Sequence, residues 1–454
     1  IISQSSHLTL SDLILKYSLP PFVFLVQSSS LPSKFVIMNL NDLDVYWGIL
    51  RAVLGFIAKL TVQKGQAIVH RYTYRSTPDP RNVVVVGGSF AGALLAQRLS
   101  HTVPSGYRVV LIEMNSHFNY AFAFPRNTVF SGREHHAFIS YENLAKGAPE
   151  GIFHHYCDQV TDVTESHVNT ASGNSLPYEY LIVATGAAQP PPARLVAKNK
   201  SDGIEELKGF QQRIGKADRV AVIGGGAVGI ELVTEIRERY PDKEVTLIHS
   251  RQQLLPRFGP KLHDHVMATL KKQNIEVLLG ERPPYPDDAG QSVQETSLTL
   301  ADGKERTWDL VIPCTGLRPR SELLAGYSPE SIAPNGEILV GPTLQVENLP
   351  SSKKNIFALG DVAQSGGPKQ ARAGIMQIDI VVNNLLRLIK GSPAEVKYVP
   401  HFFENTLKLT LGKRLSVMWA QKGDYEWMIE SKKEDEDLNV KQTRRQLNAK
   451  PEQK

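Results

Sequence analysis

The sequence predicts an α/β fold in which two parallel-sheet domains are followed by a small C-terminal α+β region. An apolar run, a group of glycines and a helical pattern follow one another twice, at Arg81–Ser100 and at Arg219–Glu235. A later buried strand in each half ends in a similar turn, at Ala184–Gly186 and at Cys314–Gly316. Strand, crossover helix and strand in the same direction form the repeating unit of a parallel sheet, so two such sheets are expected.

The first glycine turn joins a buried strand to a helix at Gly87 and Gly88. Unpaired amides and the positive end of the helix dipole attract phosphate at such a helix start. The next strand ends roughly 20 residues later on Glu113, the spacing at which an acid binds a ribose hydroxyl pair. Ser89 replaces the middle glycine of the G-x-G-x-x-G pattern and is still small, while Gly92 allows close packing of helix on strand. This turn therefore predicts a dinucleotide site.

The second glycine turn carries the complete pattern, with Gly224, Gly226 and Gly229 between a strand and a helix. Two copies about 140 residues apart predict two dinucleotides rather than one. The following strand ends on His249, without the acid that selects an unphosphorylated ribose. Arg251 either accepts a 2′-phosphate or is a solvated loop residue, so we expect tolerance of NADPH without a strict preference.

Composition is that of an ordinary soluble enzyme, with 41% hydrophobic and 21% charged residues and a net charge of +5. The length calls for two or three domains. The two cysteines, Cys157 and Cys314, form neither a C-x-x-C dithiol nor a metal-ligand spacing, which is typical of a reducing compartment. Cys314 is expected to be a small buried side chain rather than a reactive thiol.

The motifs divide the chain into five parts. Two proline-containing stretches, TPDP before the first turn and QPPP after the first strand-end turn, mark the crossings. The expected limits are 1–77 for an N-terminal extension, 78–200 and 320–395 for two pieces of the first dinucleotide-binding domain, 201–319 for the second domain, and 396–454 for the C-terminal region. We expect short strands within Tyr398–Glu430 and a frayed or peripheral tail at Ser431–Lys454.

The N-terminal extension contains an expected amphipathic helix at residues 39–63. Apolar residues, including Trp47, follow helical spacing, and Arg51 and Lys59 lie towards the opposite face. Such a helix either lies in a membrane interface or packs against the first domain or a second subunit in a homodimer. A transmembrane span would place both cations at costly depth. We assign no function to residues 1–37, and we expect the true start at either Ile1 or Met38.

Three further candidates follow apolar segments. Arg126 ends an aromatic segment and either binds a cofactor phosphate or forms a surface pair. Gly360 and Asp361 end the strand NIFALGDVA, where the carboxylate either contacts a ligand or caps the next helix. That helix is expected at Pro368–Leu388, and Lys369 at its start either assists the site or is a surface lysine.

The order of these motifs resembles that of two-dinucleotide flavoproteins over residues 81–395. VVVVGGSFAG, EVTLIHS and NIFALGDVA are most similar to the apoptosis-inducing-factor-like group, in its ferroptosis-suppressor branch, within the pyridine nucleotide-disulfide oxidoreductase type. The resemblance implies an FAD domain split by an inserted NAD(P) domain. It also implies an enzyme that passes electrons from NAD(P)H through the flavin to a quinone-type acceptor.

The motifs and the resemblance together give the expected site residues. Glu231 and Lys369 are the candidate catalytic residues, with Glu231 near the nicotinamide. The expected cofactor contacts are Gly87, Gly88, Ser89, Phe90, Ala91, Gly92, Glu113, Arg126, Val160, Ala184, Thr185, Gly186, Gly224, Gly226, Gly229, Arg251, Gly316, Gly360 and Asp361.

Two other functions remain open at this point: a redox-sensing flavoprotein scaffold with slow turnover, and an electron donor to a small redox protein. The sequence has no basic stripe with interleaved aromatic residues, which argues against nucleic acid as a partner. We expect a cytoplasmic protein. The alternative location is peripheral on a lipid droplet, on the plasma membrane or on the outer face of mitochondria. The sequence does not identify the acceptor.

Overall fold

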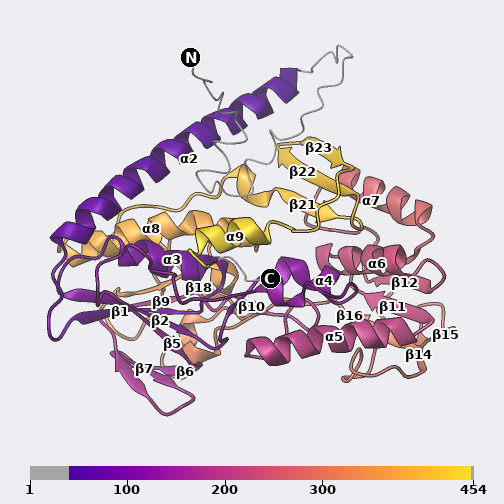
Figure 1. Ribbon diagram of the computed structural model, residues 1–454, viewed down its shortest axis with the longest axis horizontal. Helices are drawn as coiled ribbons and strands as arrows, with labels where there is room; N and C mark the ends of the chain where they lie inside the picture. Colours follow the sequence, from indigo (N-terminus) through magenta and orange to yellow (C-terminus); the bar gives the residue numbers. More distant parts are fainter. Residues whose placement is uncertain (1–39, 451–454) are drawn as a thin grey trace, which may run out of the picture.

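The computed structural model describes residues 40–450, and the predicted α/β fold class is confirmed. Two parallel sheets lie side by side, and a third, antiparallel sheet from the C-terminal region lies above one of them (Figure 1). The expectations for residues 1–37 and for Met38 fall outside the described residues.

The first parallel sheet combines strands that are far apart in the sequence. Its order is β19-β9-β1-β2-β5. The strands are β1 (Arg81–Val86), β2 (Tyr107–Glu113), β5 (Phe153–Cys157), β9 (Tyr180–Val183) and β19 (Ile356–Ala358). Val83 and Val85 of β1 pack into the core beside helices α3 (Phe90–Ser100) and α8 (Ala371–Ile389), whereas Val84 and Val86 pack on the other face. Burial on both faces explains why β1 is an unbroken valine run.

The second parallel sheet has the order β13-β12-β11-β16. The strands are β11 (Arg219–Ile223), β12 (Glu244–His249), β13 (Glu276–Leu279) and β16 (Leu310–Pro313), with helices α5 (Lys200–Lys216), α6 (Ala227–Arg239) and α7 (Pro260–Lys272). Because β19 at 356–358 returns to the first sheet, the second sheet is inserted between two pieces of the first. The domain limits expected from the sequence remain a proposal, which this sheet membership supports.

The two modules are joined by a short antiparallel ribbon of β10 (Ala187–Ala188) and β17 (Arg318–Pro319). Each strand of the ribbon directly follows one of the two strand-end turns, so both crossings between modules run together. The other short strands are β3 (Phe118–Asn119), β4 (Phe138–Ile139), β6 (Val160–Val163), β7 (His167–Thr170), β8 (Ser175–Pro177), β14 (Thr296–Thr299), β15 (Glu305–Trp308), β18 (Ile338–Leu339) and β20 (Ala363–Gln364). The single-turn helices are α4 (Phe124–Asn127), η2 (Ala121–Ala123), η3 (Glu134–Ala137), η4 (Glu322–Leu324), η5 (Pro329–Ser331), η6 (Gly360–Val362) and η7 (Phe402–Asn405).

The C-terminal region forms the antiparallel sheet β21 (Leu407–Thr410), β22 (Ser416–Lys422) and β23 (Tyr425–Ser431), as the alternating pattern indicated. Trp419 of this sheet is buried against the second module, with its ring edge-on to Phe258 at 5.1 Å between centroids. Of the two expectations for the tail after Ser431, fraying is wrong for the described residues up to 450. Helix α9 (Val440–Gln446) docks on the first module because Val440 and Leu447 are buried in its core.

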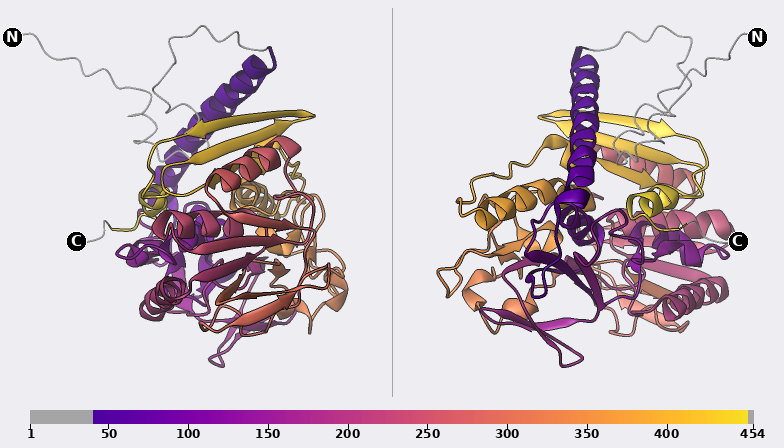
Figure 2. Two further views of the ribbon diagram at one scale, coloured as in Figure 1. Left: turned by 90° about the vertical axis from the view of Figure 1, so that its right-hand side faces the viewer. Right: turned by 60° about the vertical axis from the view of Figure 1, so that its left-hand side comes forward.

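The N-terminal helix α2 (Leu40–Thr73) is longer than the predicted 39–63. Its last turns lie along the first module, where Gln63 donates to Asp379 of α8 at 3.0 Å and His70 contacts the Val103 carbonyl at 2.7 Å. Its N-terminal part projects beyond the body of the protein (Figure 2). Among residues 40–450, no helix is long and apolar enough to cross a membrane.

Candidate functional site

The first glycine turn lies at the carboxyl edge of the first sheet and has no room for larger residues. A methyl group added at Gly87, whose φ is +100°, would lie 2.5 Å from the Ala184 carbonyl oxygen. One added at Gly92 would lie 1.8 Å from the Gly87 carbonyl oxygen. Ser89 is the N-cap residue of α3, and its side chain makes no capping hydrogen bond. The turn therefore keeps α3 close to the sheet, with its first amides facing the edge where a pyrophosphate binds.

Glu113 ends β2 beside this turn, as predicted. One carboxylate oxygen accepts from the Gly88 amide, and the other accepts from the Asn115 amide at 2.8 Å. Tyr141, which the sequence analysis missed, donates its hydroxyl to the Gly88 carbonyl at 2.7 Å. Burial raises the pKa of the Tyr141 hydroxyl well above its usual range, so the group stays a donor. The acid is thus held where a ribose would meet it.

Other predicted contacts gather at the same edge. Ala184 follows β9 next to Gly87, and Thr185 donates to the Arg320 carbonyl at 2.6 Å. Gly360 follows β19, and Ala91 at the start of α3 lies against it, 3.8 Å from where a methyl group on Gly360 would sit. Val160 is an exception, because it lies at the start of β6 in the core on the face of the sheet opposite α3, with Val86 and Ile112. Two other predicted residues border the edge, with Phe90 in an aromatic group and Gly186 in a left-handed conformation at φ +67°.

Asp361 lies in a group of charges at the mouth of the sheet. Burial raises its pKa, and the nearby cations Arg194 and Lys369 oppose that rise. Lys369 Nζ also binds the Ala363 carbonyl at 2.6 Å and Glu337 at 3.1 Å, so the alternative of a surface lysine is wrong. Because α8 begins at Ala371 rather than Pro368, Lys369 precedes this helix instead of starting it.

The second glycine turn repeats the first in geometry. A methyl group at Gly224 would lie 2.4 Å from the Cys314 carbonyl oxygen, and one at Gly229 would lie 2.0 Å from the Gly224 carbonyl oxygen. Around Gly226 there is open space, which is what a phosphate needs. Gly316 has φ +70° and closes the neighbouring turn. The two modules thus present the same kind of cradle for a dinucleotide.

His249 occupies in the second module the place of Glu113 in the first. Its Nδ1 accepts from the Gly225 amide at 3.1 Å, and its Nε2 lies 3.1 Å from the Gln253 carbonyl. Burial lowers the pKa of His249, which keeps the ring neutral with the proton on Nε2. The Arg251 side chain is exposed and makes no hydrogen bond or ion pair within the described range 40–450, although its carbonyl accepts from the Gly280 amide at 3.2 Å. β12 ends on His249 rather than on an acid, the residue type that would repel a 2′-phosphate from this position.

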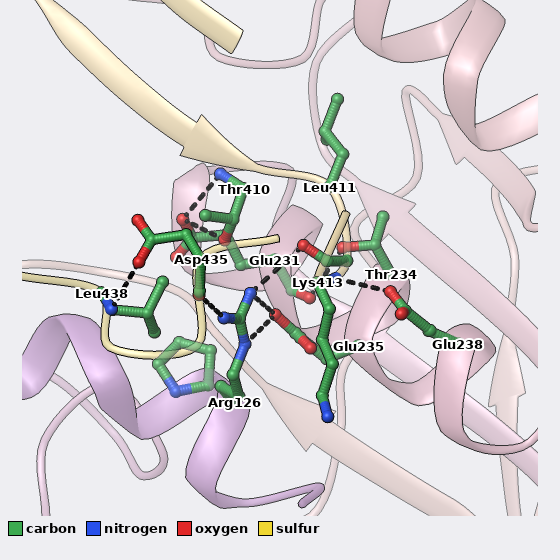
Figure 3. Close-up of polar contacts among 12 residues, drawn as sticks. Arg126, Glu231, Thr234, Glu235, Glu238, Thr410, Leu411, Lys413, Asp435 and Leu438 are labelled. Carbon is green, nitrogen blue, oxygen red and sulfur yellow. Dashed lines mark hydrogen bonds and ion pairs between the residues drawn. The ribbon is translucent and has the colours of Figure 1, made fainter. Parts of the chain in front are cut away.

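Arg126 neither contacts the first glycine turn nor forms a surface pair. It is buried, and its guanidinium lies 2.6 Å from the Glu235 carboxylate of α6 (Figure 3). It also donates to the carbonyls of Gly412, at 3.2 Å, and of Asp435. We therefore correct the expectation of a phosphate contact, because protein acceptors occupy the guanidinium. Arg126 joins the first module, the second module and the C-terminal region.

Glu231 projects from the first turns of α6 into the same junction. Its Oε1 accepts from the Thr410 amide at 3.1 Å and from the Thr410 hydroxyl at 3.0 Å (Figure 3). Burial raises the pKa of Glu231 to about 7, while the Thr410 hydrogen bonds act in the opposite direction. A carboxyl group that titrates near neutral pH at a nucleotide-binding helix is a candidate functional group.

The two cysteines do not form a redox pair. Cys157 ends β5 in the first sheet, and Cys314 follows β16 in the second. Burial raises the pKa of the Cys314 thiol to about 12, which supports the prediction of an unreactive cysteine, and the residue is partly buried. In residues 40–450, no group of three or more His, Cys, Asp or Glu side chains is placed to hold a metal.

A cleft of about 520 Å³ opens beside the Asp361 group. It is lined by Arg257 of the second module, by residues 366–369 of the first, and by Pro400, His401, Phe402 and Asn405 of the C-terminal region. Sequence reasoning missed Arg257, Phe402 and Arg194, because nothing in their local pattern marks residues that only the tertiary fold brings together. Locally, the sequence indicates a loop at this cleft only through the two glycines of GGPK, at residues 366–369 before α8.

These features define the class of protein: a two-domain FAD-dependent oxidoreductase that takes electrons from NAD(P)H. The family model for pyridine nucleotide-disulphide oxidoreductases matches residues 81–377. The chain belongs to this family.

Named relatives agree with this assignment and with the predicted branch. Fe-regulated protein 8 of Mycosarcoma maydis is 32% identical over 369 residues, which cover 76% of this chain and 90% of that protein. Ferroptosis suppressor protein 1 of Mus musculus is 30% identical over 346 residues, covering 74% and 87%. The resemblance to the ferroptosis-suppressor branch is confirmed.

Solved structures share the fold at lower identity. The sulfide:quinone oxidoreductase of Aquifex aeolicus matches with a TM-score of 0.63 at 17% identity, over 81% of this chain and 90% of that one. The water-forming NADH oxidase of Lactobacillus brevis, bound to NADH, matches with a TM-score of 0.57 at 19% identity, over 75% of each chain.

Proposed function

We propose that this oxidoreductase passes electrons from NAD(P)H through FAD to a quinone-type acceptor that binds in the cleft beside Asp361. The cleft carries the proposal, because it brings cations from two modules and an aromatic ring to one place. The name of a similar protein, sulfide:quinone oxidoreductase, supports this choice of acceptor. When bound, FAD supplies the chemistry that accepts a hydride and gives up electrons singly or in pairs.

The residues at the carboxyl edge of the first sheet are proposed to hold the FAD. The amides at Ser89, Phe90 and Ala91 face the pyrophosphate, and Glu113 binds the adenosine ribose. Gly360 and Asp361 contact the flavin side of the cofactor, with the remaining predicted residues of this edge around them. Because burial raises the pKa of Asp361, its carboxyl group is suited to share a proton with a ligand hydroxyl.

The residues at the carboxyl edge of the second sheet are proposed to hold the nicotinamide nucleotide. Gly224, Gly226 and Gly229 admit its pyrophosphate, and Arg251 meets a 2′-phosphate where one is present. Glu231 lies on the helix that starts at this turn, and we assign it to the nicotinamide side. Both NADH and NADPH are therefore expected to serve as donors.

Lys369, Arg257 and Phe402 are proposed to bind the acceptor. Phe402 offers a ring for a planar quinone to stack on. Negative charge develops on a quinone oxygen as the quinone is reduced, and the cations Lys369 and Arg257 stabilise that charge. Lys369 is held in place by the Ala363 carbonyl and by Glu337, so it reaches the cleft already oriented.

Helix α2 is proposed to hold the enzyme at a membrane surface, where a quinone with an isoprenoid tail resides. On a helical wheel, Arg51, whose guanidinium lies over the Trp47 ring, shares about one third of the circumference with the exposed large apolar side chains that are described in α2. They are Trp47, Leu54, Val62, Ile68, Val69 and Tyr72, with exposed fractions from 55% to 72%. Burying these side chains in lipid would contribute on the order of 5 kcal/mol, enough for reversible attachment.

Liposome flotation tests this attachment. The full chain should float with vesicles that contain anionic lipid, and a protein that begins at Pro78 should stay at the bottom of the gradient. Both should reduce a short-chain soluble quinone at similar rates. A shortened protein that floats equally well would remove the membrane role of α2. A full chain that stays down and elutes as a dimer would assign the apolar stripe to a second copy.

An anaerobic acceptor screen tests the central assignment. Purified holoenzyme, reduced by NADH, should be reoxidised by soluble quinones, and Lys369→Met should slow that step without loss of FAD. Lys408→Met is a matched control, because Lys408 pairs with Asp435 away from the residues that line the cleft. Equal slowing of both variants would place the acceptor elsewhere.

A further inference from the structure

Helix α6 presents three carboxylates on one face to the turn between β21 and β22. Glu231, Glu235 and Glu238 are spaced by four and three residues, so they share one side of the helix. The C-terminal region is hydrogen-bonded to Glu231 and Glu238 directly and to Glu235 through Arg126 (Figure 3). Glu238 accepts from the Lys413 amide at 2.5 Å, and Glu235 binds Arg126, which also donates to the Gly412 carbonyl. The C-terminal region is thus fixed on the nucleotide-binding helix itself.

Thr410 makes the contact that lies nearest to the second glycine turn. Its amide and its hydroxyl both donate to one oxygen of Glu231, Oε1, at 3.1 and 3.0 Å. Two donors from one residue fix the rotation of the carboxylate as well as its position. No donor among residues 40–450 is bonded to the other oxygen, Oε2, so that oxygen is left for a ligand.

Thr410 is itself held firmly. It ends β21, where it pairs with Ser416 of β22, and it is buried. The Gly412 carbonyl, two residues further on, is anchored by Arg126 from the first module. The position of the Thr410 hydroxyl therefore depends on contacts with both dinucleotide-binding modules.

We propose that Thr410 is a positioning residue for the nicotinamide nucleotide: it holds one oxygen of Glu231 so that the other faces the ligand. This inference rests on the proposed place of Glu231 beside the nicotinamide. It assigns to the C-terminal region, which lies outside the matched family segment 81–377, a supporting part in the nucleotide site.

The charged and titratable groups around Glu231 are Glu235 on the same helix, Arg126 on α4 and Tyr120 beside η2. Glu235 disfavours and Arg126 favours the ionised form of Glu231. None of these groups is altered by a change at Thr410. A shift in the ionisation of Glu231 after such a change therefore reports the lost hydroxyl.

The test compares Thr410→Val with Thr410→Ser in the holoenzyme. Two readouts are used: the pH dependence of flavin reduction by NADH in single-turnover stopped flow, and the titration of the Glu231 carboxyl by ¹³C NMR with labelled glutamate. Valine keeps the shape and the amide donor but removes the hydroxyl, so the midpoint of both titrations should rise by about one pH unit. Serine restores the hydroxyl and should return both midpoints to the wild-type value. Thr269→Val is the matched control, because the Thr269 hydroxyl donates to the His265 carbonyl of its own helix.

The outcomes separate this inference from the proposed function. If Thr410→Val leaves both midpoints unchanged while Glu231→Gln abolishes the NMR titration and slows reduction, Thr410 has no positioning role. If Glu231→Gln leaves flavin reduction unchanged, the proposed place of Glu231 beside the nicotinamide is wrong, and the inference falls with it. Loss of FAD or of stability in Thr410→Val would mean that the hydroxyl contact with Glu231 is structural. In that case, recovery of the NMR titration in Thr410→Ser would not by itself uphold the proposal.

Discussion

Replacing Glu231 by glutamine should change the way stability depends on pH. Burial raises the pKa of this carboxyl from 4.5 to about 7 in the folded protein. Between these values the folded chain keeps a proton that the unfolded chain has released. The stabilising contribution is therefore complete below pH 4.5 and is lost as the pH rises through about 7.

The size of the change follows from the two pKa values. One pKa unit corresponds to about 1.4 kcal/mol, so the wild type should lose on the order of 3 kcal/mol across this range through Glu231 alone. Glutamine has no proton to lose, and its amide oxygen accepts the same two bonds from Thr410. The stability of Glu231→Gln relative to wild type should therefore rise with pH and level off above pH 8.

Urea unfolding of both holoenzymes from pH 5 to pH 8, with excess FAD, measures this difference. Other titrating groups cancel when the two curves are subtracted. Glu238→Gln, at an exposed glutamate on the next turns of the same helix face, is the matched control for the loss of a carboxylate. Curves for Glu231→Gln and wild type that stay parallel would refute the reasoning that Glu231 titrates in a desolvated site.

Three other substitutions have definite expected results. Gly87→Ala should give folded protein with little bound flavin, as measured by flavin absorbance, because the added methyl group meets the Ala184 carbonyl. Full flavin loading of this variant would contradict the proposed cradle. Arg251→Glu should weaken NADPH binding by about 1–3 kcal/mol more than NADH binding in titration calorimetry, and equal losses would make Arg251 structural. Arg126→Met should destabilise the protein by about 3–5 kcal/mol, because it leaves the Glu235 carboxylate buried without a partner, and Arg126→Met with Glu235→Leu should recover much of the loss in urea unfolding.

The fold could be predicted from the sequence because its signals are local. Each glycine turn lies between a buried strand and a helix, and Gly87 and Gly224 make the same close approach to a neighbouring carbonyl oxygen in the two modules. The cradle residues therefore lie where the spacing placed them. Glu113 and Asp361 could also be placed, since the carboxyl ends of neighbouring parallel strands meet at one edge.

The contacts between modules could not be predicted in this way. The aromatic segment before Arg126 looks like a cofactor wall, yet the guanidinium binds Glu235, which lies 109 residues further along the chain. The mixed-charge residues after Ser431 look like a solvated tail, but Val440 and Leu447 are buried in the core of the first module. In both cases a residue far away in the sequence determines the environment, and no local pattern records it.

Double-mixing stopped flow tests the central claim most directly. The holoenzyme is first reduced by NADH without oxygen and is then mixed with a short-chain soluble quinone, while flavin absorbance is followed. We expect rapid bleaching in the first step and rapid return of the flavin absorbance in the second, with only the second step slowed in Lys369→Met. A flavin that NADH does not reduce, or a reduced flavin that quinone reoxidises no faster than a buffer blank, would contradict the assignment.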